Sequence, residues 1–319
     1  MYKIKLIPDN THIPFLKVRM IAFAISALLI LGSIGMFFSA GVNKGIDFEG
    51  GILIEVGMPK APDVADMRGK LGDLGLGQVA LQTFGSDSDI LIRVQRQEGD
   101  AKAQEAAVDK VKVQLAKDYG DGVSYRRVEF VGPTVSAELV QTAIEAVGAA
   151  VLAMLVYIWL RFEWHYSVGA IMALVHDVIL TIGMFAVTRI EFNLASVAAI
   201  LTIVGYSIND TVVVYDRIRE NFRRYKKMDV KVLIDLSINE TLSRTTMTSF
   251  TTLLALIALY IFGGEVIRGF STAMIFGIVV GTYSSIFIAA PLLLLFGLSH
   301  RSAEDDGFKS AEAESGEKG

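Results

Sequence analysis

Cysteine is absent from this chain of 319 residues, which excludes disulfide bonds and cysteine metal sites and removes any redox clue to the compartment. An excess of either charge is also missing, because 30 Lys and Arg stand against 34 Asp and Glu. This balance gives no indication of a nucleic-acid partner. The sequence has no phosphate-binding loop, cluster of metal ligands or activated nucleophile. We therefore expect no enzyme activity and no cofactor.

Long apolar stretches are what the chain has in abundance. Hydrophobic residues make up 52% of it, and six stretches approach the roughly 17–25 residues that span a bilayer. The first stretch could be a signal peptide, but it exceeds the roughly 7–15 apolar residues of such peptides, which favours an uncleaved anchor. The sequence therefore predicts an α-helical integral membrane protein with six transmembrane helices. The predicted spans are Met20–Phe38, Ala143–Leu160, Ser167–Thr188, Leu194–Tyr215, Thr246–Phe262 and Phe270–Phe296.

Residues 39–136, between the first and second spans, have the composition of a soluble domain. Gly51–Val56 has the pattern of a strand, and Ala61–Leu76 has that of a helix with an acidic first turn. Four further segments complete the order β-α-β-β-α-β, which is typical of a ferredoxin-like α+β fold. These are strands at Gln78–Phe84 and Asp89–Gln95, a helix at Asp100–Gly120 and a strand at Val123–Gly132.

Lysine and arginine are distributed unevenly around the spans. They flank the first span on its N-terminal side and fill the stretch 216–245, whereas the opposite short loops hold only Arg189 and Arg268. Because basic residues mark cytoplasmic loops, we predict cytoplasmic N- and C-termini and an extracytoplasmic domain. The predicted parts are a cytoplasmic N-terminus at 1–19, the first span at 20–38, the domain at 39–136, a five-helix bundle at 137–298 with a basic cytoplasmic loop at 216–245, and a disordered acidic tail at 299–319.

The fourth and fifth spans contain charged side chains, each of which costs about 2.5–3.5 kcal/mol at mid-membrane on insertion scales. Asp210, next to Asn209, lies near the end of the fourth span, and Arg244 lies where the fifth begins. At a rise of about 1.5 Å per residue the two charges reach a similar depth, so we predict an ion pair if these helices are neighbours. We favour a proton path, although a purely structural pair that fixes helix docking is the alternative.

The third span contains His176 and Asp177 near its middle, without an obvious cation on a neighbouring span. Burial favours the neutral form of a carboxyl group. His176 could be its hydrogen-bond partner or could itself titrate. A proton-coupling site and a simple packing pair both stay open.

Small residues repeat every four positions from Ala273 to Ala289 on the sixth span and include Gly277 and Gly281. Such a stripe lets another helix approach closely, so we predict helix packing there. Hydroxyl side chains crowd the start of the fifth span and could bond between helices or line a wet cleft. After the fourth span, a basic helix would lie along the inner surface near anionic lipid, and Asp216 and Arg217 could dock it onto the bundle.

Four motifs resemble the SecD/SecF family of the bacterial Sec translocon, a branch of the resistance-nodulation-division superfamily, and its SecF type in particular. The order of one span, one external domain and five spans is similar too, and the resemblance covers about residues 15–298. The motifs are GIDFEGG (Gly45–Gly51), HDV (His176–Val178), GYSINDTVVVYDRIREN (Gly205–Asn221) and LSRTTMTSFTTLL (Leu242–Leu254).

The resemblance implies an accessory subunit of preprotein export that uses the proton motive force in the bacterial cytoplasmic (inner) membrane. The family's functional carboxylate and arginine fall on Asp210 and Arg244. A further essential carboxylate belongs to SecD. The match at GIDFEGG implies a role at the membrane–domain junction for Gly45, Asp47, Gly50 and Gly51. The implied partners are SecD, the SecYEG channel, YajC as a further candidate, translocating preprotein and membrane lipid.

A small-molecule exporter of the same superfamily is the alternative function. Such exporters normally carry two external domains and twelve spans in one chain, which is twice what this sequence contains. A third possibility is an assembly factor whose charges are structural. Co-purification of a six-span partner with a large external domain would favour the export subunit.

Overall fold

The computed structural model describes residues 8, 11–77, 79–84, 86–99 and 101–298. Within them, six helical segments are long and apolar enough to cross a membrane. The predicted tail at 299–319 and most of the first ten residues lie outside the described part. The six segments are Phe15–Ala40, Val135–Arg161, Trp164–Thr188, Leu194–Arg224, Val230–Phe262 and Ile267–Leu295.

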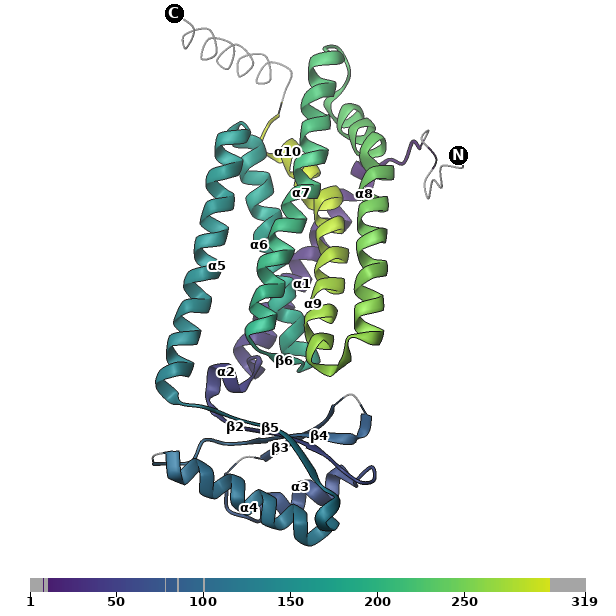
Figure 1. Ribbon diagram of the computed structural model, residues 1–319. Helices are drawn as coiled ribbons and strands as arrows, with labels where there is room; N and C mark the ends of the chain where they lie inside the picture. The colour runs from purple at the N-terminus through teal and green to yellow at the C-terminus, as the bar shows by residue number, and fades with distance from the viewer. Residues whose placement is uncertain (1–7, 9–10, 78, 85, 100, 299–319) are drawn as a thin grey trace, which may run out of the picture.

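The helices form an elongated bundle, with a small domain of strands and helices beyond one end (Figure 1). We call this end of the bundle the domain end. The opposite end, where α10 and the connection between α7 and α8 lie, is the terminus end (Figure 1). The bundle consists of α1 (Arg19–Ala40), preceded by the 3-10 turn η1 (Phe15–Val18), α5 (Pro133–Arg161), α6 (Trp164–Thr188), α7 (Leu194–Arg224), α8 (Val230–Phe262), α9 (Gly264–Ser284), the π-helical turn η3 (Ser285–Ala289) and α10 (Ala290–Leu295).

Three spans form the buried centre of the bundle. The most apolar windows of α6, α7 and the α9–α10 span are 61%, 56% and 61% buried, whereas those of α1, α5 and α8 are 11%, 6% and 17% buried. The outer helices therefore present most of their apolar surface outward. In a membrane, lipid or a partner helix covers such a surface.

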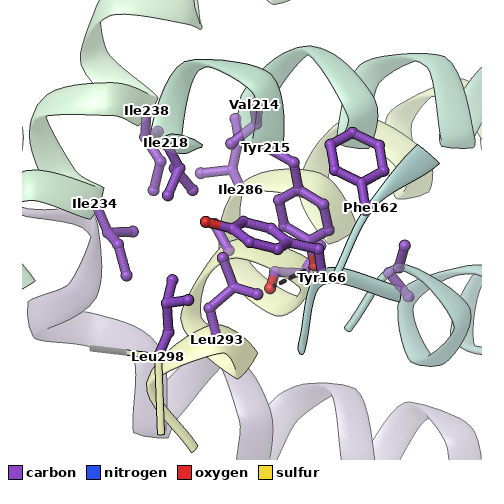
Figure 2. Close-up of a cluster of buried hydrophobic side chains, with 14 of the residues drawn as sticks. Phe162, Tyr166, Val214, Tyr215, Ile218, Ile234, Ile238, Ile286, Leu293 and Leu298 are labelled. Carbon is purple, nitrogen blue, oxygen red and sulfur yellow. Dashed lines mark hydrogen bonds between the residues drawn. The ribbon is translucent and has the colours of Figure 1, made fainter. Parts of the chain in front are cut away.

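A large apolar cluster fills the terminus end, with Tyr215 of α7 fully buried in it (Figure 2). The Tyr215 ring packs edge-on against Phe162 and Tyr166, with ring centroids 6.0 and 5.2 Å away. Its hydroxyl donates to the carbonyl of Ala289 at 3.0 Å. Pro291 lacks a backbone N–H and follows the π-helical turn, so the helical ladder is interrupted here. Tyr215 anchors this irregular segment to α7.

The domain contains a four-stranded antiparallel sheet with strand order β3-β4-β2-β5. Its elements follow one another as strand, helix, strand, strand, helix and strand, which is the predicted order. They are β2 (Gly51–Gly57), α3 (Val64–Gly72), β3 (Val79–Phe84), β4 (Ser86–Val94), α4 (Ala101–Tyr119) and β5 (Ser124–Val131).

The two faces of this sheet differ. Alternate strand residues such as Ile54 and Ile92 are fully buried with Met67 of α3 and Val111 of α4, so both helices cover one face (Figure 1). The other face points toward the bundle across a cavity of about 560 Å³. Polar and charged residues line this cavity from both sides, including Glu55 and Arg127 on the sheet and Tyr260 and Arg268 at the domain end of the bundle.

The stretch 216–245, predicted as a charged loop, is mostly helical. Only residues 225–229 connect α7 with α8. An ion pair between Arg217 and Glu220, three residues apart, supports the last turns of α7. Asp229 caps α8 by accepting hydrogen bonds from the first backbone N–H groups of that helix. The high charge of the stretch belongs to the outer turns of a helical hairpin, and this differs from the basic helix expected along the membrane surface.

Candidate functional site

Asp177 of α6 is fully buried, and three side chains lie within hydrogen-bond distance of its carboxylate. His176 Nδ1 lies 2.8 Å from one oxygen. The other oxygen accepts hydrogen bonds from Ser207 of α7 at 2.5 Å and from Ser284 of α9 at 2.7 Å. These bonds compensate the carboxylate for the loss of water and join the three central helices.

His176 extends this network to α1. Its Nε2 lies 3.2 Å from the hydroxyl of Ser26, which lies 3.1 Å from the hydroxyl of Tyr283. Tyr283 in turn donates to the carbonyl of Ala22 at 3.1 Å. The histidine ring is therefore held at both nitrogens, and the pair of His176 and Asp177 has a clear packing role. Whether the pair also carries a proton stays a prediction.

Asp210 of α7 is 6% exposed and has fewer polar neighbours. One oxygen accepts a hydrogen bond from Ser285 at 2.7 Å. The buried hydroxyl of Thr245 on α8 lies near this carboxylate, but the two groups do not meet hydrogen-bond geometry. Asp210 is thus nearly enclosed while its carboxylate is only partly satisfied.

The predicted ion pair between Asp210 and Arg244 is not formed within the described residues. The two helices are neighbours as predicted, but Arg244 is exposed on the outer side of α8. Thr245 occupies the position that faces Asp210, and one residue along a helix is a rotation of about 100°. Arg244 still lies within electrostatic reach of Asp210. Asn209 is exposed as well and points away from the bundle centre.

Two adjacent serines link the environments of the two carboxylates. Ser284 donates to Asp177, and Ser285 donates to Asp210. Ser285 begins the π-helical turn, and such turns are frequent at functional sites. In the sequence, Ser285 was noted only as one member of the small-residue stripe, and Ser284 was not noted at all. Two neighbouring hydroxyls inside an apolar span are the signal that would have found them.

The stripe of small residues packs against α7 within the same chain. A Cβ atom at Gly277 would lie 2.4 Å from side-chain atoms of Ile203, and one at Gly281 would lie 3.1 Å from the Cβ of Ser207. The predicted close helix contact is therefore present, between α9 and α7. It brings the serines of α9 and η3 to the carboxylates of the neighbouring helices.

The motif GIDFEGG forms the turn that leads from the bundle into the domain. After the short helix α2 (Ile46–Glu49), Gly50 and Gly51 adopt φ angles of +72° and +130°, which favour glycine. A Cβ at Gly51 would lie 2.8 Å from the carbonyl oxygen of Val94. A Cβ at Gly45 would lie 2.4 Å from a side-chain oxygen of Glu191. The three glycines thus permit close approach at the junction.

The same junction is attached to the connection between α6 and α7. The short strand β1 (Asn43–Lys44) pairs in parallel with β6 (Glu191–Phe192). Asp47 accepts a hydrogen bond at 3.0 Å from the backbone N–H of Leu194, so its negative charge lies at the N-terminus of α7. Arg93 of β4 forms an ion pair with Glu191. The domain is therefore linked to α7, the helix that carries Asp210, as well as to α1 and α5.

Asp216 and Arg217 dock the terminus end of α7 onto its neighbours. Both oxygens of Asp216 accept hydrogen bonds from Arg161 of α5, at 2.9 and 3.0 Å. Arg217 donates to Glu240 of α8 at 2.8 Å. These contacts join α7 to α5 and α8, whereas the expectation was that the two residues dock a surface helix onto the bundle.

The arrangement can hold a proton but offers little to a metal ion. Two carboxylates, a histidine and several hydroxyls lie in hydrogen-bonded contact inside the bundle. Within the described ranges, no group of three or more His, Asp or Glu side chains is placed to hold a metal ion.

The chain is similar to known membrane proteins of protein export. A family model described as "Protein export membrane protein SecD/SecF, C-terminal" matches residues 111–299, and one described as "SecD/SecF GG Motif" matches residues 35–58. The protein translocase subunit SecF of Rickettsia akari is 47% identical over 298 residues, which cover 93% of this chain and 96% of that protein. SecF of Rickettsia prowazekii is 45% identical, with 93% and 94% covered.

Solved structures of SecDF are similar as well. The crystal structure of SecDF from Thermus thermophilus, a translocon-associated membrane protein, matches with a TM-score of 0.81 and 33% identity over 91% of this chain. SecDF in a super-membrane-facing form matches with a TM-score of 0.68 and 32% identity over 99% of this chain. This chain spans 39% and 41% of those longer chains. By its motifs, its helices and these relatives, the chain belongs to the SecF branch of the SecD/SecF family of protein-export membrane proteins.

Proposed function

We propose that this chain works with a SecD subunit in the Sec translocase and uses the proton motive force to promote preprotein movement across the bacterial cytoplasmic membrane. The observation that carries the proton step is the environment of Asp210. Its carboxylate is nearly buried, receives a hydrogen bond from Ser285 and lies within electrostatic reach of Arg244 without a direct ion pair. A carboxylate in such a place changes its interactions when it gains a proton.

Protonation of Asp210 removes its attraction to Arg244 and changes its hydrogen bond with Ser285. The contacts of α7 with α8 and η3 then rearrange. A potential of 100 mV supplies about 2.3 kcal/mol per charge, which biases a two-state element roughly fiftyfold. Because α7 begins at the hydrogen bond between Leu194 and Asp47, a movement of α7 reaches the domain directly.

The SecD subunit covers the exposed polar side chains of α7 and α8. Asn209, Arg244 and Thr248 are exposed on these spans. Polar side chains facing hydrocarbon are costly, so a protein partner is the better neighbour. SecD brings the further carboxylate of the proton site, and the pair acts beside the SecYEG channel, with YajC as an additional component.

The domain is an extracytoplasmic ferredoxin-like unit that engages the emerging preprotein, and both termini are cytoplasmic. The strand order β3-β4-β2-β5 and the two helices on one face support the fold. The chain does no bond-making chemistry of its own. Its role is to convert a proton movement into a movement of the domain.

Export in membrane vesicles with an imposed proton gradient tests this function. Asp210→Asn and Arg244→Met should keep insertion and co-purification with SecD and should lose gradient-stimulated export, while ATP-driven initiation survives. Glu138→Gln, at an exposed position of α5, removes one negative charge away from the site, so it serves as the control and should export normally. Normal gradient-stimulated export by either test variant would show that the pair is structural.

A further inference from the structure

A hollow lined by charged side chains lies at the terminus end, between α5 and α7. Its volume is about 520 Å³. Arg161, the last residue of α5, lines one side of the hollow, and the remaining lining residues come from the last turns of α7. The lining residues are Arg161, Asp216, Arg219, Glu220, Arg223 and Arg224.

The acidic side chains around this hollow already have basic partners. Asp216 binds Arg161, and Glu220 binds Arg217 at 2.6 Å. Glu163, at the start of α6, binds Arg219 at 2.8 Å. Neither Arg223 nor Arg224 forms an ion pair with another described residue, and the guanidinium of Arg224 lies over the ring of Tyr225 at 5.3 Å. Two cationic groups at the hollow are therefore available to an anion.

The surroundings of the hollow are apolar on one side. Leu160 and Trp159, directly before Arg161, are 81% and 62% exposed, and Val156 one turn earlier is 52% exposed. Trp164 at the start of α6 is half exposed. Exposed tryptophans are typical of the membrane–water boundary. The hollow thus lies where the apolar outer surface of α5 meets a basic rim.

We propose that this hollow binds the phosphate headgroup of an anionic phospholipid whose acyl chains lie along the outer face of α5. A guanidinium group can donate two parallel hydrogen bonds to the oxygens of a phosphate, and Arg223 and Arg224 each offer such a group. A soluble phosphate would use only the charged rim, whereas a lipid also covers Val156 and Leu160. Since the α5 span is only 6% buried, a bound lipid would help to hold this helix against the bundle.

Lipid binding by the purified full-length chain tests the proposal. The titrant is phosphatidylglycerol in detergent micelles, followed by native mass spectrometry, with phosphatidylcholine as the neutral lipid. The double variant Arg223→Gln/Arg224→Gln removes the two available cations. The control Lys227→Gln/Lys231→Gln removes the same charge from exposed positions of the same hairpin that do not line the hollow. Circular dichroism verifies that both variants fold.

We expect one tightly bound phosphatidylglycerol per wild-type chain and binding weaker by about tenfold or more in the arginine variant, because charge-assisted hydrogen bonds are lost. The lysine variant should change by less than about twofold. Equal losses in both variants would reduce the site to general surface charge and overturn the proposal. Equal binding of the neutral lipid would show that an anionic headgroup is not recognised and would overturn it as well. Displacement of the lipid by millimolar inorganic phosphate would show that the site recognises free phosphate, and would overturn the lipid assignment.

Discussion

Asp177 and Asp210 are the same residue type in one bundle, yet their surroundings differ. Asp177 is fully buried and has His176, Ser207 and Ser284 at its two oxygens. Asp210 is slightly exposed and accepts from Ser285, while Thr245 stands near without a hydrogen bond. We propose that this difference in satisfied polar contacts makes Asp177 a carboxylate that holds the helices together and Asp210 one that responds to a proton.

A change of protonation would have different costs at the two positions. At Asp177 it would disturb contacts with three helices at once, because its partners lie on α6, α7 and α9. At Asp210 it would disturb a hydrogen bond to η3 and the field of Arg244. Buried polar groups are costly when their partners are removed, so the better-connected carboxylate is the worse switch. Substitutions at both carboxylates and at the residues around them test this difference.

Asp177→Ala should destabilise the bundle most, by about 3 kcal/mol or more, because it leaves three buried polar groups without a partner at about 1–3 kcal/mol each. The measurement is thermal or denaturant unfolding in one detergent. Asp216→Ala is the control, since its pair with Arg161 is about 40% exposed and such pairs contribute about 0–1 kcal/mol. If the two variants are equally stable, the network around Asp177 does not hold the helices.

Gly277→Leu should have the next largest effect. A side chain at this position would overlap Ile203 of α7, and overpacking costs about 1–3 kcal/mol. The contact holds Ser284 of α9 and Ser285 of η3 against the two carboxylates, so the variant should also weaken their hydrogen bonds. Gly205→Ala on α7 has open space around the new methyl group and serves as the control. An unchanged unfolding midpoint for Gly277→Leu would mean that α7 and α9 are not held in close contact.

Local patterns were enough to predict much of this architecture. Runs of apolar residues set the six helices, and the order of elements in the domain followed from alternation and turn residues. The stretch 216–245 was predicted as a charged loop with a basic helix along the membrane surface. The continuation of α7 and α8 into this stretch was not predicted, because charged outer turns of a hairpin have the composition of a loop. A helix boundary inside a charged segment depends on capping by Asp229 and on contacts with neighbouring helices.

The details of the site depend on the rotation of helices that are far apart in the sequence. Ser207 and Ser284 meet Asp177 from positions 30 and 107 residues away. The adjacent hydroxyls of Ser284 and Ser285 stand out inside an apolar span, but nothing local in the sequence indicates which carboxylate each of them contacts. The expected ion pair shows the same limit, because Arg244 and Thr245 differ by one position and the packing of α8 decides which of them faces Asp210. The carboxylates were predictable, and so was His176 as a hydrogen-bond partner of Asp177, whereas the serine partners were not.

Ser284→Ala and Ser285→Ala each remove a single hydrogen bond to one of the two carboxylates. Ser284→Ala removes one hydrogen bond to a fully buried carboxylate, and hydrogen bonds between membrane helices contribute about 0.6 kcal/mol on average and up to about 1.7. Ser285→Ala should cost less, since Asp210 is slightly exposed and can adjust to another donor. Unfolding of both variants under the same conditions gives the difference. A larger loss for Ser285→Ala would reverse the assignment of the two carboxylates.

Asp210→Asn should have the smallest effect on stability and the largest effect on coupling. The amide is nearly the same size as the carboxyl group, and its oxygen can still accept the hydrogen bond from Ser285, so the change should stay below about 0.6 kcal/mol. The amide cannot gain or lose a proton, so its interaction with Arg244 can no longer change with protonation. Unfolding and gradient-stimulated export are measured on the same preparation. Asp177→Asn is the matched substitution at the other carboxylate. It should lower the free energy of unfolding, while the protein that stays folded keeps gradient-stimulated export. If Asp210→Asn unfolds as readily as Asp177→Asn, both carboxylates belong to the framework of the bundle, and the responsive group lies elsewhere.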